Sequence, residues 1–216
     1  MIKKKKILGI ILARAGSQRI INKNLQKIKN KNLIEVAAET AIKSKIFNLI
    51  VLYSDIQKKN AIPNKKLIKN IVFLKREKKF SNSRISSEDT LLSMFDKFKY
   101  LKRYENLMLL QPTSPLRTTI HIRKAYNIYK KNNFKNLVSV IKVKNKHSSK
   151  NYFQRNSKTF KTNGAIYITN INFFLKKKYL FNKTTYLMQM SKESSLDIDT
   201  KNDLKIAKIY LKKYRL

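Results

Sequence analysis

The chain of 216 residues has no cysteine, and it has only three glycines and three prolines. Without cysteine, a disulfide framework, a thiolate metal site and a thiol nucleophile are all excluded. Any metal chemistry must therefore use oxygen ligands. The absence of disulfides fits a reducing compartment, and we expect the protein to be cytoplasmic. Because glycine and proline are so rare, the places where they occur are informative.

Acidic residues are also scarce, with 12 Asp and Glu against 50 Lys and Arg, and the formal net charge is +38. A strongly basic surface attracts nucleic acid or anionic membrane without sequence specificity. However, lysines occur in every segment, and only Lys3 to Lys6 form a dense block. No nucleic-acid-binding motif accompanies the charge, so we expect non-specific binding at low salt but no specific nucleic-acid partner.

No hydrophobic run approaches the length of a transmembrane helix, and we expect no membrane partner. The opening MIKKKKILGIILARA has the basic head and short apolar stretch of a signal peptide. That stretch, from Ile7 to Ala13, is at the short limit, and Arg14 interrupts it directly before a loop. Hydrophobic residues make up 42% of the chain and are spread along it, which excludes general disorder and fits one domain over residues 1–216.

Short apolar runs rich in β-branched residues predict buried strands at 7–12, 49–53, 71–74, 107–110, 137–143 and 165–168. Helical spacing appears between them in two sets: Leu91, Met94, Phe95 and Phe98, and then Ile122, Ala125, Tyr126 and Tyr129. Capping-box pairs, Ser86 with Asp89 and Thr200 with Asp203, mark two helix starts. Alternating strands and helices predict an α/β fold with a mainly parallel sheet covered on both faces.

Residues 144–161 form the longest polar stretch, and they lack apolar periodicity. We interpret this stretch as an excursion from the domain and not as a linker. In a parallel sheet, ligands bind beyond the carboxyl ends of the strands, so the loops that follow strands are the places to search for a site.

The loop after the first expected strand runs from residue 12 to residue 24 and is cationic. Gly16 permits close backbone approach, and Arg14, Arg19 and Lys23 supply positive charge. This combination suits a triphosphate. The alternative is an ordinary basic turn in a lysine-rich protein. The triphosphate interpretation of this loop depends on support from the other loops.

The loop after the fourth expected strand contains two of the three prolines. Pro112 and Pro115 stiffen the exit from the strand, so the amide of Gln111 is presented in a fixed direction. An oriented amide suits a sugar hydroxyl. The alternative is a rigid turn in which Thr113 or Ser114 caps the next helix, and both interpretations can hold.

An acidic pair lies near the carboxyl end of the chain. In extended chain, Asp197 and Asp199 point to one side and Ile198 points to the other, so two carboxylates can share a cation. Mg²⁺ prefers one or two carboxylates together with water and phosphate oxygens. The alternative for Asp199 is favourable charge at the start of the C-terminal helix.

Taken together, these loops resemble the acylneuraminate cytidylyltransferases, the CMP-sialic acid synthetases. The first loop is similar to their signature R-x-G-S-K-x-x-x-x-K-N, matched by Arg14, Gly16, Ser17, Lys23 and Asn24. Residues 111–117, QPTSPLR, resemble a second signature. Residues 163–168 resemble a third and residues 195–200 a fourth. The resemblance covers nearly the whole chain in order.

The resemblance implies a Rossmann-like fold of the nucleotide-diphospho-sugar transferase type. It implies that the anomeric hydroxyl of a sialic-type acid attacks the α-phosphorus of CTP, with Mg²⁺ as cofactor and pyrophosphate as leaving group. It assigns residues to phosphates (Arg14 and Lys23), nucleotide (Gly16, Ser17, Gln18, Arg19, Asn24, Arg76 and Ser87), substrate (Gln111 and Asn163) and metal (Asp197 and Asp199). A homodimer is also implied.

The sequence departs from the family pattern in three places. Gln18 stands where most members have a lysine that contacts the triphosphate, and Lys161-Thr162 stands for the usual Arg-Pro. By the resemblance, the polar stretch 144–161 is a shortened dimerisation arm, in which Lys146 or Lys150 could replace basic residues that bind the sugar carboxylate. The acceptor could equally be legionaminate, pseudaminate or octulosonate. A basic nucleic-acid-binding relative without activity is the alternative of another class.

Five further polar residues are candidates for roles near the site. Ser54 and Asp55 resemble the family's Ser-Thr-Asp segment, although Asp55 could cap a helix instead. Arg117 has either a structural role or a role in the site. His121 and His147 lack the partner spacing of a triad or zinc site, and we assign neither a catalytic role.

Overall fold

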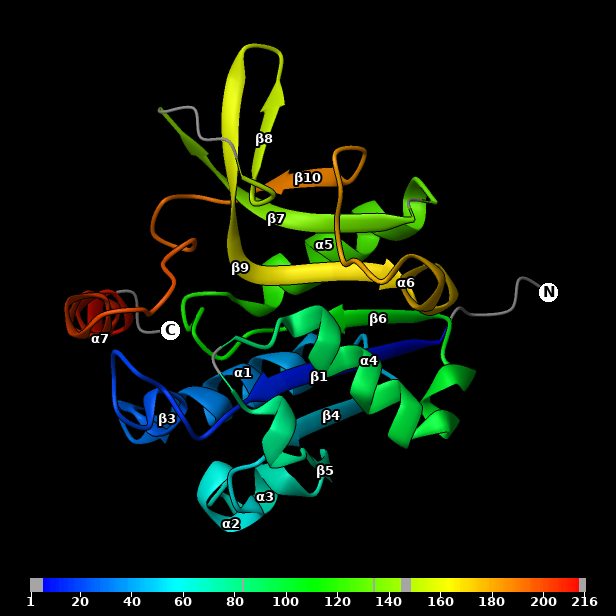
Figure 1. Ribbon diagram of the computed structural model, residues 1–216. Coiled ribbons are helices and arrows are strands. Elements are labelled where there is room, and N and C mark those ends of the chain that lie inside the picture. The colour runs from blue at the N-terminus through cyan, green and yellow to red at the C-terminus, as the bar shows by residue number, and fades with distance from the viewer. Residues whose placement is uncertain (1–5, 83, 134, 145–148, 214–216) are drawn as a thin grey trace.

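The computed structural model describes residues 6–82, 84–133, 135–144 and 149–213. Its centre is an eight-stranded sheet with the order β10-β7-β9-β6-β1-β4-β5, to which β8 is added beside β9 (Figure 1). The strands are β1 Ile7–Ala13, β4 Leu49–Ser54, β5 Val72–Lys75, β6 Asn106–Leu109, β7 Asn136–Val143, β8 Tyr152–Arg155, β9 Lys158–Asn170 and β10 Tyr186–Gln189. A separate small sheet pairs β2 Lys27–Ile28 with β3 Lys31–Asn32.

The main sheet is mostly parallel, as expected. The parallel pairs are β1 with β4, β1 with β6, β4 with β5, and β7 with β10. Strand β9 alone runs against its neighbours β6, β7 and β8. Because β9 is reversed, it begins at the edge where the parallel strands end. The start of β9 and the loops after β1, β4 and β6 therefore lie at the same edge of the sheet.

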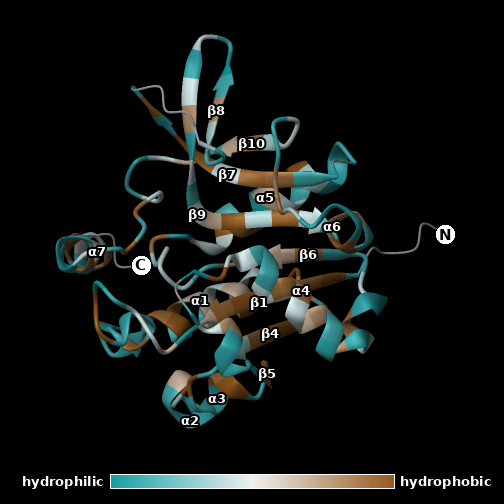
Figure 2. Cartoon of the chain, viewed as in Figure 1, coloured by the Kyte–Doolittle hydropathy of each residue, from teal (hydrophilic) through white to brown (hydrophobic). Residues whose placement is uncertain are grey.

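The inner strands are strongly hydrophobic (Figure 2). Their apolar residues alternate between two cores, so helices cover both faces of the sheet. Ile7 and Ile11 of β1 face α1 Leu33–Ser44 and α5 Thr119–Lys131. Leu8 and Ile10 face α4 Ser87–Lys97 and α6 Ile171–Lys177 on the opposite side. The two expected helical faces lie in α4 and α5, with Phe98 at the C-cap of α4.

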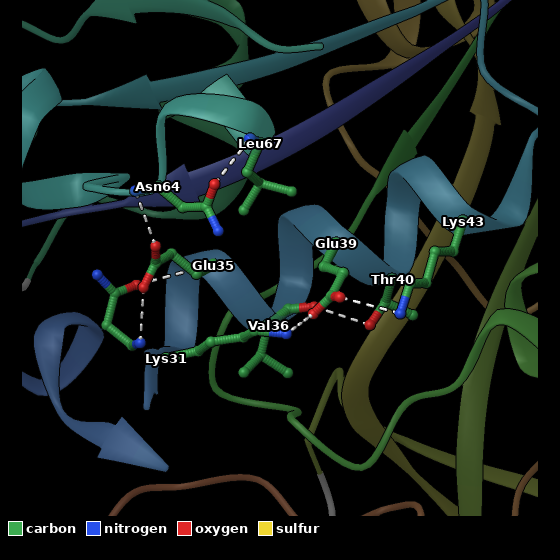
Figure 3. Close-up of polar contacts among 9 residues, drawn as sticks. Lys31, Glu35, Val36, Glu39, Thr40, Lys43, Asn64 and Leu67 are labelled. Atoms are coloured by element: carbon green, nitrogen blue, oxygen red, sulfur yellow. Dashed lines mark hydrogen bonds and ion pairs between the residues drawn. The ribbon is translucent and has the colours of Figure 1, made fainter. Parts of the chain in front are cut away.

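Helix α1 is fixed at its start by a reciprocal cap and on its surface by ion pairs (Figure 3). Asn32 accepts a hydrogen bond from the Glu35 amide, and Glu35 accepts one from the Asn32 amide. The second Glu35 oxygen accepts from the Asn64 amide and so holds the chain before α3 Lys65–Ile68. Glu39 pairs with both Lys31 and Lys43. These contacts fix the helix that lies behind the first loop.

Both expected capping pairs lie at helix starts, but of the two only the Thr200–Asp203 pair forms the reciprocal box among the described residues. Ser86 accepts from the Asp89 amide at the start of α4. Thr200 accepts from the Asp203 amide, and the Asp203 carboxylate accepts from the Thr200 amide, at the start of α7 Lys201–Lys213. Helix α7 packs through buried Leu204 and Ala207 against a third apolar cluster, which also contains Ile198. The acidic segment before α7 is thereby anchored to the body of the protein.

The remaining helices are short: α2 Lys58–Ala61 and the 3-10 turns η1 Lys23–Leu25, η2 Lys78–Phe80 and η3 Lys99–Arg103. The expected polar excursion is a β-hairpin, in which β8 pairs with the first part of β9 and projects beyond the sheet (Figure 1). Residues 145–148 of the excursion lie outside the described residues. Within the described ranges, no helix is long and apolar enough to cross a membrane.

Candidate active site

A pocket of about 220 Å³ lies at the edge of the sheet where β1, β4 and β6 end. It is lined by residues from four segments that are far apart in the sequence. Nine of the residues assigned above to phosphate, nucleotide, substrate or metal are among them: Arg14, Ser17, Lys23, Asn24, Arg76, Ser87, Gln111, Asp197 and Asp199. The N-terminal cationic loop and the C-terminal acids therefore share one pocket.

The first loop is held in place by hydrogen bonds to its backbone. Asn24 donates from Nδ2 to the Arg14 carbonyl at 3.0 Å, and the Ala15 amide donates to Asp55 Oδ1 at 2.9 Å. Asp55 thus fixes the loop and does not cap a helix. A Cβ built at Gly16 would meet no atom within 4 Å. The space beside Gly16 is open to a ligand, and its role in close approach to one stays a prediction.

The acids of the fourth motif meet the cations of the first. Lys23 Nζ lies 2.9 Å from Asp199 Oδ1, and Arg19 Nη1 lies 3.4 Å from Asp199 Oδ2. Lys23 is largely covered, with 17% of its side chain exposed, whereas Arg19 is 71% exposed. Gln18 and Arg19 do not line the pocket themselves, and Arg19 reaches it through Asp199.

Asp197 lies deeper than Asp199, and one of its oxygens, Oδ1, is buried without a hydrogen-bond partner. Burial raises the pKa of Asp197 to about 6; the charge of Asp199 acts in the same direction, and a hydrogen bond from Thr113 and the charge of Lys23 act against it. A buried carboxylate oxygen without a hydrogen-bond donor is unfavourable. It is also a free oxygen ligand for a cation, so this pair of carboxylates fits Mg²⁺.

Gln111 and Asp197 converge on Gly164, which has a positive φ of 76°. A Cβ on Gly164 would lie 2.9 Å from Gln111 Oε1 and 3.3 Å from Asp197 Oδ2. Glycine is therefore required here both by the backbone conformation and by the approach of these two side chains. The amide of Gln111 and the Asp197 carboxylate form one wall of the site.

Arg117, at the end of the QPTSPLR segment, is buried behind that wall. Its Nη1 donates to the carbonyl oxygens of Gln111 and Ala165, each at 2.9 Å. Burial lowers the pKa of Arg117 to about 9, and the guanidinium stays protonated at neutral pH. Arg117 does not line the pocket. Arg117 thus contacts the backbone behind the site and not the space inside it.

Asn163, expected to contact the substrate, is buried and does not line the pocket. Its Oδ1 accepts from Ser139 Oγ at 2.6 Å and from the Ala165 amide at 3.2 Å. Its Nδ2 donates to Ser195 Oγ at 2.9 Å. The amide therefore joins β7, β9 and the segment before Asp197, and its part in substrate binding stays a prediction.

Arg76 and Ser87 occupy the side of the pocket formed by β5 and α4. The guanidinium of Arg76 is held by Thr90 Oγ1 at 3.0 Å and by the Phe80 carbonyl. Burial lowers the pKa of Arg76, and Asp55 and Tyr53 counteract this shift. Ser87 is the first residue of α4 and lines the pocket. Both residues are placed where a nucleotide could reach them.

The other polar candidates lie outside the pocket. His121 Nδ1 lies 3.0 Å from Thr118 Oγ1 in the cap of α5, and burial lowers its pKa. Lys150 lies 3.8 Å from Glu88 in α4. His147 and Lys146 fall outside the described residues. Several contacts had no signal in the sequence, namely those of Asp55 with the loop and of Arg117 with two carbonyls.

Known proteins resemble this chain over most of its length. A family model described as cytidylyltransferase matches residues 8–215. The N-acylneuraminate cytidylyltransferase of Escherichia coli O18:K1:H7 is 32% identical over 94% of this chain and 51% of its own length, so the chain spans about half of that relative. The CMP-N,N'-diacetyllegionaminic acid synthase of Campylobacter jejuni is 30% identical over 95% of this chain and 94% of its own.

Among solved structures, a CMP:2-keto-3-deoxy-manno-octonic acid synthetase complexed with CTP aligns with a TM-score of 0.70. The alignment covers 97% of this chain and 100% of that chain at 14% sequence identity, and it therefore supports the fold alone. The family model covers nearly all of the chain and includes each loop that lines the pocket. The chain therefore belongs to the cytidylyltransferase family.

Proposed function

We propose that the protein transfers CMP from CTP to the anomeric hydroxyl of a nonulosonic acid of the sialic type and releases pyrophosphate. The observation that carries this proposal is the meeting of the cationic loop and the acidic pair, with Lys23 and Asp199 2.9 Å apart in one pocket. A metal-bound triphosphate needs cations for its phosphates and carboxylates for its metal within a short distance.

In this proposal Arg14 and Lys23 bind the phosphates, and Ser17 and the backbone beside Gly16 complete the phosphate loop. Asn24 and Asp55 hold that loop by hydrogen bonds to its backbone. The cations stabilise the negative charge that grows on the departing pyrophosphate, which is the main electrostatic demand of such a transfer. Arg76 and Ser87 contact the nucleotide, with Arg19 at the exposed end.

Asp197 and Asp199 would hold Mg²⁺, which would supply charge neutralisation at the phosphates. The unpartnered, buried Oδ1 of Asp197 supports this assignment. Lys23 and Arg19 both pair with Asp199. Binding of a triphosphate to these two cations would leave Asp199 available to hold the metal.

The acceptor is proposed to lie against Gln111 and Asn163. The amide of Gln111 reaches the pocket from the stiffened loop after β6 and is suited to orient a sugar hydroxyl. Asn163 keeps one amide hydrogen beyond the one it donates to Ser195. Relatives of this chain are named for N-acylneuraminate, N,N'-diacetyllegionaminic acid and pseudaminic acid. We therefore propose only the class of acceptor. The particular acidic sugar must be found by testing a panel of such sugars.

The test is release of pyrophosphate from CTP by the purified protein with a panel of acidic sugars, with and without Mg²⁺. We expect turnover only with a nine-carbon acid and a divalent cation. The D199A variant should lose turnover, whereas D96A, which changes an exposed carboxylate of α4 away from the pocket, should keep it. Absence of turnover with every acceptor, or activity retained by D199A, would refute the proposal.

We further propose that the protein works as a homodimer in the cytoplasm. The β8–β9 hairpin, which projects beyond the sheet, is the candidate arm for contact with a second copy (Figure 1). The lack of cysteine suits a reducing compartment. Light scattering coupled to gel filtration should give the mass of two chains, and a variant with the hairpin shortened should give the mass of one.

A further inference from the structure

Arg117 joins the two chain segments that form the acceptor wall of the pocket. One nitrogen, Nη1, donates to the carbonyl of Gln111 at the end of β6 and to the carbonyl of Ala165 in β9. These strands are antiparallel neighbours, yet their register pairs end at Leu109 and Tyr167. Beyond these last paired residues, the two hydrogen bonds from Arg117 therefore join the strands in place of backbone hydrogen bonds.

The charge of Arg117 has no acidic partner. Only 2% of the residue is exposed, and none of the ion pairs among the described residues involves it. Burial alone accounts for its lowered pKa, and its Nε is buried without a hydrogen-bond partner. A buried, unpaired charge is destabilising, so stability alone does not account for an arginine here.

The two carbonyls that Arg117 holds lie on either side of the contact between the Gln111 side chain and Gly164. Gln111 carries the amide that faces the pocket, and Ala165 follows Gly164, whose missing Cβ makes room for that amide. If the carbonyls separate, Gln111 and Gly164 separate with them. A misplacement of about 1 Å at a reacting centre can reduce the rate on the order of 100-fold.

We propose that Arg117 is a positioning residue for the transfer reaction: by bridging the backbone of Gln111 and Ala165 it sets the direction in which the Gln111 amide meets the acceptor. The inference rests on the proposed function. It does not concern the phosphate end of the pocket, where Arg14 and Lys23 lie on other segments. Arg117 is thus expected to affect the acceptor and the chemical step, and to leave CTP binding unchanged.

The test compares R117A and R117K with wild type, each confirmed to be folded at the assay temperature by its circular dichroism spectrum. Lysine keeps the charge, but its ammonium falls one bond short of the position of Nη1. We expect kcat to fall roughly 10- to 100-fold and KM for the acceptor to rise, with KM for CTP within about twofold of wild type.

Arg123 offers a matched control. It also donates to two backbone carbonyls, those of Ser44 and Lys43, at 3.0 and 3.1 Å, but these lie at the end of α1 and away from the pocket. R123A should lose some thermal stability and keep its kinetic constants. A purely structural Arg117 would behave in the same way as Arg123.

Guanidinium ion provides a second readout. Arg117 also lines a crevice of about 490 Å³ together with Pro115, Thr118 and Leu211, so truncation to alanine opens the vacated space to solvent. Guanidinium, at concentrations far below those that unfold proteins, should restore kcat of R117A and should not change wild type or R123A.

Folded R117A and R117K with the kcat and acceptor KM of wild type would overturn the inference and leave the proposed function intact. Equal changes in the constants for CTP and acceptor would also overturn it. A wild-type protein without CTP-dependent turnover would overturn the proposed function, and the inference with it.

Discussion

The strongest quantitative prediction concerns Asp197, because the structure gives it opposite effects on stability and on activity. Its pKa is raised from 3.8 to about 6, mainly by burial. One unit of pKa corresponds to about 1.4 kcal/mol, so the ionised carboxylate lowers the free energy of unfolding by up to about 3 kcal/mol at neutral pH. The D197N variant removes the charge and keeps the shape. It should be more stable than wild type by up to about 3 kcal/mol, and it should lose Mg²⁺-dependent turnover.

The sign of the pH dependence follows from the direction of the shift. Between pH values of about 4 and 6, the folded chain keeps a proton on Asp197 that the unfolded chain has released. The contribution of Asp197 to the stability of wild type therefore falls as pH rises through this range. The stability difference between D197N and wild type should be small below a pH of about 4 and full above about 7.

The assay is urea unfolding of both proteins at several pH values without Mg²⁺, combined with pyrophosphate release. D203N is the control, because Asp203 accepts hydrogen bonds from the Thr200 amide and hydroxyl at 2.7 and 2.8 Å, and its pKa is lowered. D203N should be less stable than wild type by about 1 kcal/mol. If D197N is no more stable than wild type at neutral pH, the argument from burial is refuted. If D197N keeps its metal-dependent turnover, the metal assignment is refuted.

Three further predictions concern other parts of the chain. G164A forces an alanine to a φ of 76° and crowds both the Gln111 amide and the Asp197 carboxylate, so the acceptor KM should rise while the CTP dissociation constant, measured by calorimetry without Mg²⁺, stays unchanged. A weaker affinity for CTP would contradict this. Q18K adds a cation to the first loop and should tighten CTP binding about tenfold; an unchanged calorimetric constant would mean that Arg19 already supplies the charge. N32A removes the cap of α1 and should lower the free energy of unfolding by about 1 kcal/mol, measured in urea, without changing the turnover of folded protein.

The sheet could be predicted from the sequence because its central strands are continuous apolar runs. Strands β1, β4, β6 and β7 lie where expected to within one or two residues, since their Ile, Leu and Val are buried on both faces. The hairpin could not be predicted in this way. Strand β8 and the first part of β9 bury few residues, such as Phe153, and expose polar ones such as Gln154 and Lys161, so they lack a continuous apolar run. Strand β10 is only four residues long and was missed.

The sequence was sufficient to predict which loops meet in the candidate site. Arg14, Lys23 and Asp199 could be chosen because charge is informative in loops that follow strands, and the structure brings them into one pocket. Contacts between a side chain and a distant backbone atom carry no such pattern. The bond from Ala15 to Asp55 and the enclosed amide of Asn163 depend on the folded path of the chain and not on spacing in the sequence.

Because the pocket draws on residue 14 and on residue 199, it cannot form before residue 199 has been made. Strands β1, β4 and β6 can associate once β6 has left the ribosome, but the carboxylates follow only after β9 and β10. Until then, a nascent chain would expose the cationic loop without the carboxylate that pairs with Lys23 and Arg19. The carboxylate that completes the pocket thus also neutralises two cations that would otherwise attract polyanions such as ribosomal RNA.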